Sequence, residues 1–62
     1  MSVRTYLSND LRFRKIFIGK EPDDFYIVFT ETGYAMSKKF KSFDLAFKDT
    51  EKVFGKLKPD YI

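Results

Sequence analysis

Two clusters of charged residues could do chemistry in this chain, one of lysines and one of carboxylates. The lysines stand in Ser37-Lys38-Lys39-Phe40-Lys41-Ser42, around one aromatic residue. Their ammonium groups can neutralise phosphates, and an exposed aromatic ring can stack on a base. The same pattern is typical of a solvated edge strand whose lysines prevent aggregation. Both interpretations stay open at this point.

The carboxylates of Glu21, Asp23 and Asp24 could form an acid pair or a site for a hard metal ion. Neighbouring residues on an extended chain point to opposite sides, so Asp23 and Asp24 converge poorly. The spacing also lacks the regular Asp/Asn positions and the terminal Glu of a calcium-binding loop. We therefore expect a solvated loop between two strands.

Most catalytic chemistry lacks the side chains it requires. The chain contains no cysteine and no histidine, which excludes disulfides and zinc sites built from those ligands. None of the serines has a histidine to activate it. The glycines Gly19, Gly33 and Gly55 are too scattered for a phosphate-binding loop. We expect neither an enzyme nor a cofactor.

The length and composition indicate one small domain, residues 1–62, with 44% hydrophobic and 34% charged residues. A chain of this size buries only about 60% of its unfolded surface, so it needs a dense core or a second chain. Eight Phe and four Tyr can supply both. No segment approaches the roughly 18 apolar residues of a membrane span, and Met1–Asp10 does not resemble a signal peptide. We expect a soluble, cytoplasmic protein.

The elements that position these residues include a C-terminal helix. Spacings of three and four predict a helix from Phe43 to about Leu57, with an apolar face of Phe43, Ala46, Phe47, Thr50, Val53, Phe54 and Leu57. Ser42 is placed to cap the N-terminus of this helix, and Pro59 prevents its continuation. Gly55 offers an end one turn earlier.

The middle of the chain predicts a β-hairpin. Phe25 to Thr30 is rich in β-forming residues, and Thr32-Gly33 supplies a tight turn. In that register Phe29 faces Met36 and Phe25 faces Phe40. One face then holds Phe25, Ile27, Phe29, Met36, Lys38 and Phe40, and the other holds Tyr26, Val28, Thr30, Lys39 and Lys41.

The N-terminal third predicts one or two further strands. Leu11 to Ile18 predicts a strand in which Phe13 and Phe17 share one parity and Ile16 and Ile18 the other. A bulge near Lys15, or a strand that is apolar on both faces, would explain this change of phase. Val3 to Leu7 is a candidate fourth strand. The expected fold is α+β, with a three- or four-stranded antiparallel sheet and one C-terminal helix packed on one face.

A single helix covers one face of a sheet and leaves the other open. We expect the Phe25 face beneath the helix. The uncovered face then holds Tyr26, Val28 and either the Phe13/Phe17 or the Ile16/Ile18 pair, with basic residues around it. The predicted interaction surface consists of Arg12, Arg14, Phe17, Tyr26, Val28, Lys39 and Lys41. The alternative is an N-terminal segment folded across this face.

The junction Lys39-Phe40-Lys41-Ser42-Phe43, with Ala46 one turn into the helix, resembles the end of several small DNA-binding modules. The arm-binding domains of phage integrases and the WGR domain have similar endings. The resemblance implies a non-catalytic, DNA-binding role. It covers about a third of the chain, and the Trp-Gly-Arg signature of the WGR domain is absent, with Gly33-Tyr34 where it would fall. It assigns no family.

The sequence is therefore compatible with two functions. The first is a small non-catalytic protein-interaction module, an inhibitor or adaptor of the kind that phages and mobile elements encode. It would bind a protein partner, or itself as a homodimer, through aromatic anchors on the uncovered face. The alternative is a nucleic-acid-binding module, with Arg12, Arg14, Lys39 and Lys41 on phosphates and Tyr26 stacked on a base. The net charge of +3 is small and mixed with acids, so protein interaction ranks first.

Overall fold

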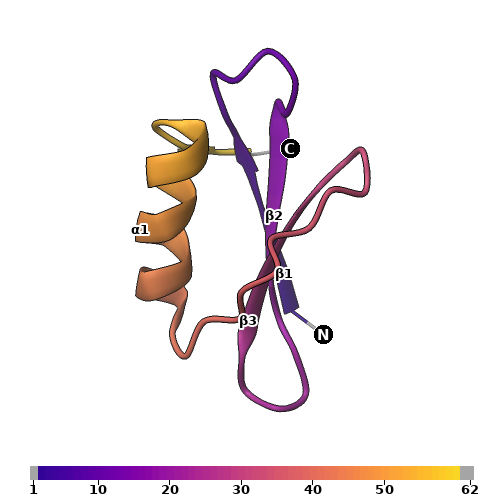
Figure 1. Cartoon of the computed structure of the whole chain (residues 1–62), viewed down its shortest axis with the longest axis vertical. Coiled ribbons are helices and arrows are strands. Elements are labelled where there is room, and N and C mark those ends of the chain that lie inside the picture. Colours follow the sequence, from indigo (N-terminus) through magenta and orange to yellow (C-terminus); the bar gives the residue numbers. More distant parts are fainter. Residues whose placement is uncertain (1, 61–62) are drawn as a thin grey trace.

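The computed structural model describes residues 2–60 and contains one sheet and one helix (Figure 1). The elements in chain order are β1 (Ser2–Leu7), β2 (Lys15–Lys20), β3 (Tyr26–Thr30), α1 (Phe43–Phe54) and β4 (Lys58–Pro59). The strands are antiparallel, in the order β3-β2-β1-β4, and α1 lies on one side of them. The expected α+β class is confirmed. No helix of the described part is long and apolar enough to cross a membrane.

The helix α1 begins and ends at residues whose local chemistry explains both boundaries. The Ser42 hydroxyl accepts a hydrogen bond from the Leu45 N–H at 3.2 Å, which confirms the predicted N-cap. Gly55 follows with a φ of 84°, a left-handed conformation that glycine adopts without strain. The predicted extension of the helix to Leu57 is therefore wrong, and the earlier end at Gly55 is correct.

The residues after α1 return to the sheet as β4, a strand that the sequence did not indicate. The Leu57 N–H donates a hydrogen bond to the Glu51 carboxylate at 3.1 Å, and the Leu57 side chain is buried. The chain then pairs Lys58 with Leu7 and Pro59 with Tyr6 on β1. Pro59 has no N–H to donate and so suits this edge position.

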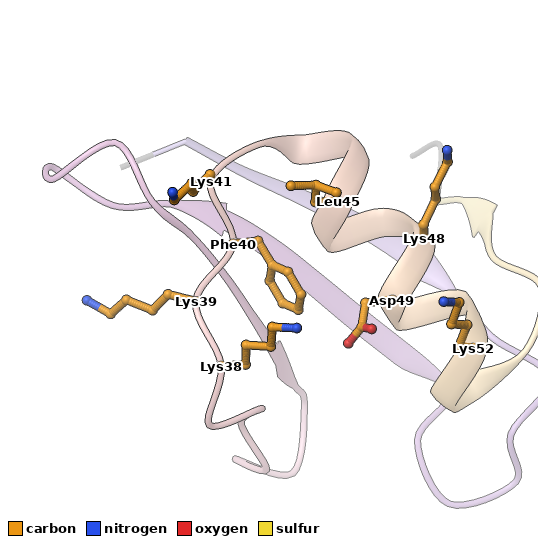
Figure 2. Close-up of a pocket in the computed structure, with 8 residues that line it drawn as sticks. All are labelled: Lys38, Lys39, Phe40, Lys41, Leu45, Lys48, Asp49 and Lys52. Carbon is orange, nitrogen blue, oxygen red and sulfur yellow. The ribbon is translucent and has the colours of Figure 1, made fainter.

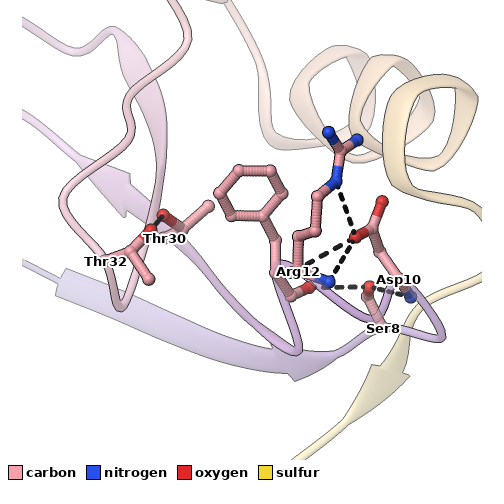
Figure 3. Close-up of polar contacts among 6 residues, drawn as sticks. Ser8, Asp10, Arg12, Thr30 and Thr32 are labelled. Atoms are coloured by element: carbon pink, nitrogen blue, oxygen red, sulfur yellow. Dashed lines mark hydrogen bonds and ion pairs between the residues drawn. The ribbon is translucent and has the colours of Figure 1, made fainter.

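The strand β2 begins at Lys15, four residues later than predicted, because the residues before it form a structured loop. Ser8 Oγ donates to the Phe13 carbonyl at 2.9 Å, and Asp10 Oδ1 accepts from the Arg12 N–H at 2.8 Å (Figure 3). Phe13 thus lies outside the strand. Within β2 the register is unbroken, with Ile16 and Ile18 buried on one face and Phe17 on the other, so the strand is apolar on both faces, as the second of the two predicted alternatives has it.

The predicted register after β3 is wrong at both of its bridges. Phe29 lies opposite Ala35 instead of Met36, and Phe40 lies opposite Tyr26 instead of Phe25, so each pair is offset by one residue, in opposite directions. A shift of one residue moves every side chain of a strand to the other face. Lys38, expected on the buried face, is exposed.

The observed pairing puts Phe40 on the same face of the sheet as Tyr26 and Val28, and α1 covers this face. Val28 is 0% exposed and belongs to the core beneath α1, with Tyr6, Ile16, Ile18, Phe40, Ala46, Phe54 and Leu57. The prediction that Phe25, Ile27 and Phe29 lie beneath the helix is therefore wrong. Ile18 lies opposite Val28 across the sheet, so branched aliphatic side chains form one compact layer under α1.

A cluster of four aromatic rings fixes the start of α1 to the sheet. Phe43 contacts Tyr6, Tyr26 and Phe47, with ring centroids 5.9–6.2 Å apart, and the Arg4 guanidinium lies 4.4 Å from the Phe43 centroid. Such aromatic contacts add to the stability gained from buried area alone. Tyr26 thus packs against the first turn of α1.

Candidate functional site

The side of the sheet opposite α1, here called the open face, is mostly apolar. The register of the strands places Thr5, Phe17 and Phe29 in one row across it, and Val3, Gly19 and Ile27 in the next. A third row contains Lys15, Leu7 and Lys58. The open face therefore has an apolar centre and two lysines at one end.

Two stacked phenylalanines form the centre of the open face. The rings of Phe17 and Phe29 lie 5.2 Å apart between centroids, with an interplanar angle of 23°. They bury part of each other, but both stay partly exposed, as does Ile27. Val3 is 44% exposed and Leu7 39%. Figure 1 shows no helix or strand packed on this side of the sheet among residues 2–60, although the loop after β3 projects toward it.

The two ends of the sheet differ in charge. The positive end, with the β1–β2 loop and β4, has a small excess of basic residues, namely Arg12, Arg14, Lys15 and Lys58 against Asp10, Glu31 and Asp60. The other end is here called the negative end because the β2–β3 turn itself carries Glu21, Asp23 and Asp24 against Lys20, while Lys39 and Lys41 of the following segment lie beside it. The open face thus lies between a positive end and a negative end.

The sheet brings only one predicted aromatic anchor, Phe17, to the open face. The placement of Tyr26 and Val28 there is wrong, because both point toward α1. Val28 is fully buried, and the Tyr26 ring contacts Phe43 at 6.1 Å between centroids, edge to face. Phe29, Ile27 and Val3 take their places, and Phe29 and Ile27 were missed because the predicted faces of β3 were reversed.

The predicted basic residues Arg12 and Arg14 belong to the loop that precedes β2. The Arg12 guanidinium lies 5.5 Å from the Phe13 centroid, and its Nε is 3.8 Å from Asp10 Oδ1. The Arg14 side chain is exposed, and its carbonyl accepts a hydrogen bond from the Ser8 N–H at 2.8 Å. Both residues contribute to the positive end of the sheet rather than to its centre.

Lys39 lies near the negative end and is held by two carboxylates. Its Nζ is 2.9 Å from Glu21 Oε1 and 3.3 Å from Asp23 Oδ2. These contacts, first the hydrogen bond to Glu21 and then that to Asp23, raise the pKa of Lys39. The pKa of Asp23 is lowered, chiefly because its carboxylate accepts a hydrogen bond from the Phe25 N–H, and also because of Lys39. The positive charge of Lys39 is thus largely offset by these two carboxylates.

A second candidate site lies on the other side of the molecule, between α1 and the segment 38–41. Here a concavity of about 350 Å³ is lined by Lys38, Lys39, Phe40, Lys41, Leu45, Lys48, Asp49 and Lys52 (Figure 2). Lys41, the last of the predicted site residues, lies at its rim. The sequence shows the basic segment and the helical lysines separately, but only the fold reveals that they meet.

The carboxylates of the β2–β3 turn are engaged with lysines, and no group of three potential metal-ligating side chains lies together among the described residues. The chain matches no protein-family model, and no curated protein or solved structure is significantly similar to it. The two surfaces, the open face and the lysine-lined concavity, are therefore interpreted from their own geometry.

Proposed function

We propose that this chain is a small, non-catalytic protein-interaction module that acts through its open face. The observation that carries the proposal is the uncovered row of Phe17 and Phe29 with the neighbouring Val3 and Ile27. A contiguous apolar patch bordered by charged residues is typical of protein interaction sites. Water contact with these side chains is unfavourable, at about 25 cal/mol per Å² of apolar surface, and a partner removes it.

A second copy of the chain fits this face, and the distribution of charge supports that choice. A two-fold axis in the plane of the interface, perpendicular to the strands, places the positive end of one copy over the negative end of the other. Lys15 then lies near Glu21 and Asp23 of the second copy. Such a self-complementary arrangement is the usual one for homodimers.

The size of the open face sets the strength of this dimer. Four strands about 4.8 Å apart, with about 3.4 Å per residue along a six-residue strand, give a patch of about 19 by 20 Å. That is below the roughly 800 Å² that each partner buries in a stable complex. We therefore expect a weak dimer, with a dissociation constant on the order of 100 µM.

Two matched substitutions test the proposal by sedimentation velocity over a range of protein concentrations. Val3→Lys puts a charge on the open face, whereas Val53→Lys makes the same change on α1, where Val53 is 54% exposed. The wild type and Val53→Lys should shift from monomer to dimer as concentration rises, and Val3→Lys should stay monomeric. Circular dichroism establishes that both variants are folded.

A wild type that remains monomeric at concentrations up to about 1 mM would contradict self-association. Equal association by Val3→Lys and Val53→Lys would place the interface elsewhere. The alternative predicted from the sequence, nucleic-acid binding by the uncovered sheet face, would need Tyr26 for stacking and Arg12, Arg14, Lys39 and Lys41 for phosphates. Because Tyr26 packs against Phe43 and Lys39 pairs with Glu21, the geometry supports protein interaction better.

A further inference from the structure

The lysine-lined concavity beside α1 is independent of the open face and has its own chemistry. Phe40 pairs with Tyr26 at the edge of β3, and the chain then turns within two residues into α1. The helix therefore runs back alongside the segment 38–41. Leu45, Lys48, Asp49 and Lys52 follow spacings of three and four and so share the side of α1 that lines the concavity.

The positive charge of the chain is concentrated at this place. Lys38, Lys41, Lys48 and Lys52 make no ion pair with a carboxylate of residues 2–60, whereas Lys39 is paired with Glu21 and Asp23. With Asp49 included, the uncompensated lysines leave a local formal charge of +3, equal to that of the whole chain. An anion is therefore attracted here more than elsewhere on the surface.

The interior of the concavity combines charge with an apolar wall. Lys38, Asp49 and Lys52 project into the gap between the two segments, while Lys39 and Lys48 project away from it (Figure 2). Lys38 Nζ lies 5.6 Å from the Phe40 centroid, and Leu45, 54% exposed, stands at the helix side. Lysine ammonium groups bind phosphate as point charges, and an exposed Leu side chain can cover a flat ring.

We propose that this concavity binds a nucleotide, with its phosphates on the lysines and its base against Leu45 and Asp49. The volume of about 350 Å³ lies at the lower end of small-molecule sites. The Asp49 carboxylate repels a phosphate placed beside it but accepts hydrogen bonds from the N–H groups of a base. Free nucleotides and nucleotides of a single strand share this chemistry, and the experiment separates them.

The test is an NMR titration of isotope-labelled protein with three probes: inorganic triphosphate, ATP without metal, and a short single-stranded oligothymidylate. Saturable shifts at the backbone amides of residues 38–41 and 45–52 are expected with ATP or with the strand. Tighter binding of ATP identifies a free nucleotide as the ligand, and tighter binding of the strand identifies a nucleic acid. Equal affinity for triphosphate and the nucleotide probes would overturn the assignment of a base.

Matched variants separate this site from a general effect of net charge. The double substitution Lys38→Gln/Lys52→Gln should weaken binding about tenfold, while Lys20→Gln/Lys56→Gln, with the same change in charge away from the concavity, should leave affinity nearly unchanged. Asp49→Asn should strengthen triphosphate binding, because it removes the repulsive carboxylate. Equal losses in both double variants, or no saturable binding by any probe, would overturn the proposal.

Discussion

Lys39 illustrates how a charged residue of the predicted site serves the structure instead. Its ammonium group joins Glu21 and Asp23 beside the β2–β3 turn, at 2.9 and 3.3 Å. Because the pKa of Asp23 is lowered, its contribution to stability is present above its usual pKa of 3.8 and is lost as pH falls. Because the pKa of Lys39 is raised, its contribution is present below 10.5 and is lost as pH rises beyond it.

The first prediction concerns the origin of the lowered pKa of Asp23. Lys39→Met should raise the pKa of Asp23 only part of the way to 3.8, because the hydrogen bond from the Phe25 N–H is the larger cause and remains. A carboxyl NMR titration measures this value. Lys20→Met, which removes the partner of Asp24, is the control and should leave the pKa of Asp23 unchanged. A complete return to 3.8 in Lys39→Met would show that Lys39 dominates.

The second prediction concerns the residue that starts the helix. Ser42→Ala should lower the free energy of unfolding by about 1 kcal/mol, because the Leu45 N–H loses its acceptor. Ser37→Ala, at an exposed serine of the preceding loop, should change it by less than about 0.5 kcal/mol. Urea denaturation at low protein concentration measures both. Equal losses for the two variants would contradict the capping role.

At the scale of the elements, two substitutions in β3 test which face of the sheet lies beneath the helix. Val28→Ala should destabilise the fold by about 2 kcal/mol, because it leaves a cavity at a fully buried site. Ile27→Ala removes a larger side chain but should cost less, because Ile27 lies on the open face and is partly exposed. Thermal unfolding of the dilute monomer compares them. A greater loss for Ile27→Ala would mean that the faces are reversed.

The same element shows why the sequence predicted some features and not others. The cap at Ser42 and the start of α1 depend on neighbouring residues, so the local pattern was sufficient. The face of β3 depends on its pairing with the next segment, and both faces of Tyr26–Thr30 are apolar enough to be buried. Periodicity alone cannot choose between such faces, and the assumed tight turn after Thr30 shifted the register by one residue.

At the scale of the whole molecule, the α+β architecture and one uncovered sheet face followed from the count of elements. One amphipathic helix can cover one side of a sheet, whichever side that is. The composition of the open face did not follow, so Phe17 was identified while Phe29 and Ile27 were assigned to the core. The concavity beside α1 was missed because it forms between segments that meet only in the fold.

The chain as a whole has two separate surfaces, one apolar and one basic. The open face is on the opposite side of the sheet from α1, and the concavity is beside α1. We therefore predict that the two functions are separable: Val3→Lys should abolish self-association while nucleotide affinity changes by less than about threefold. NMR titration of that variant with ATP and the oligothymidylate measures the affinity. A loss comparable to that of Lys38→Gln/Lys52→Gln would mean that the two surfaces act as one.

The most direct test of the central claim, self-association through the open face, is a dilution series followed by NMR. Amide and methyl signals of isotope-labelled protein are recorded from about 1 mM to about 20 µM. Signals of the open face, above all those of Val3, Phe17, Ile27 and Phe29, should move with concentration while those of α1 stay fixed. Signals that do not move at any concentration, or that move only along α1, would contradict the claim.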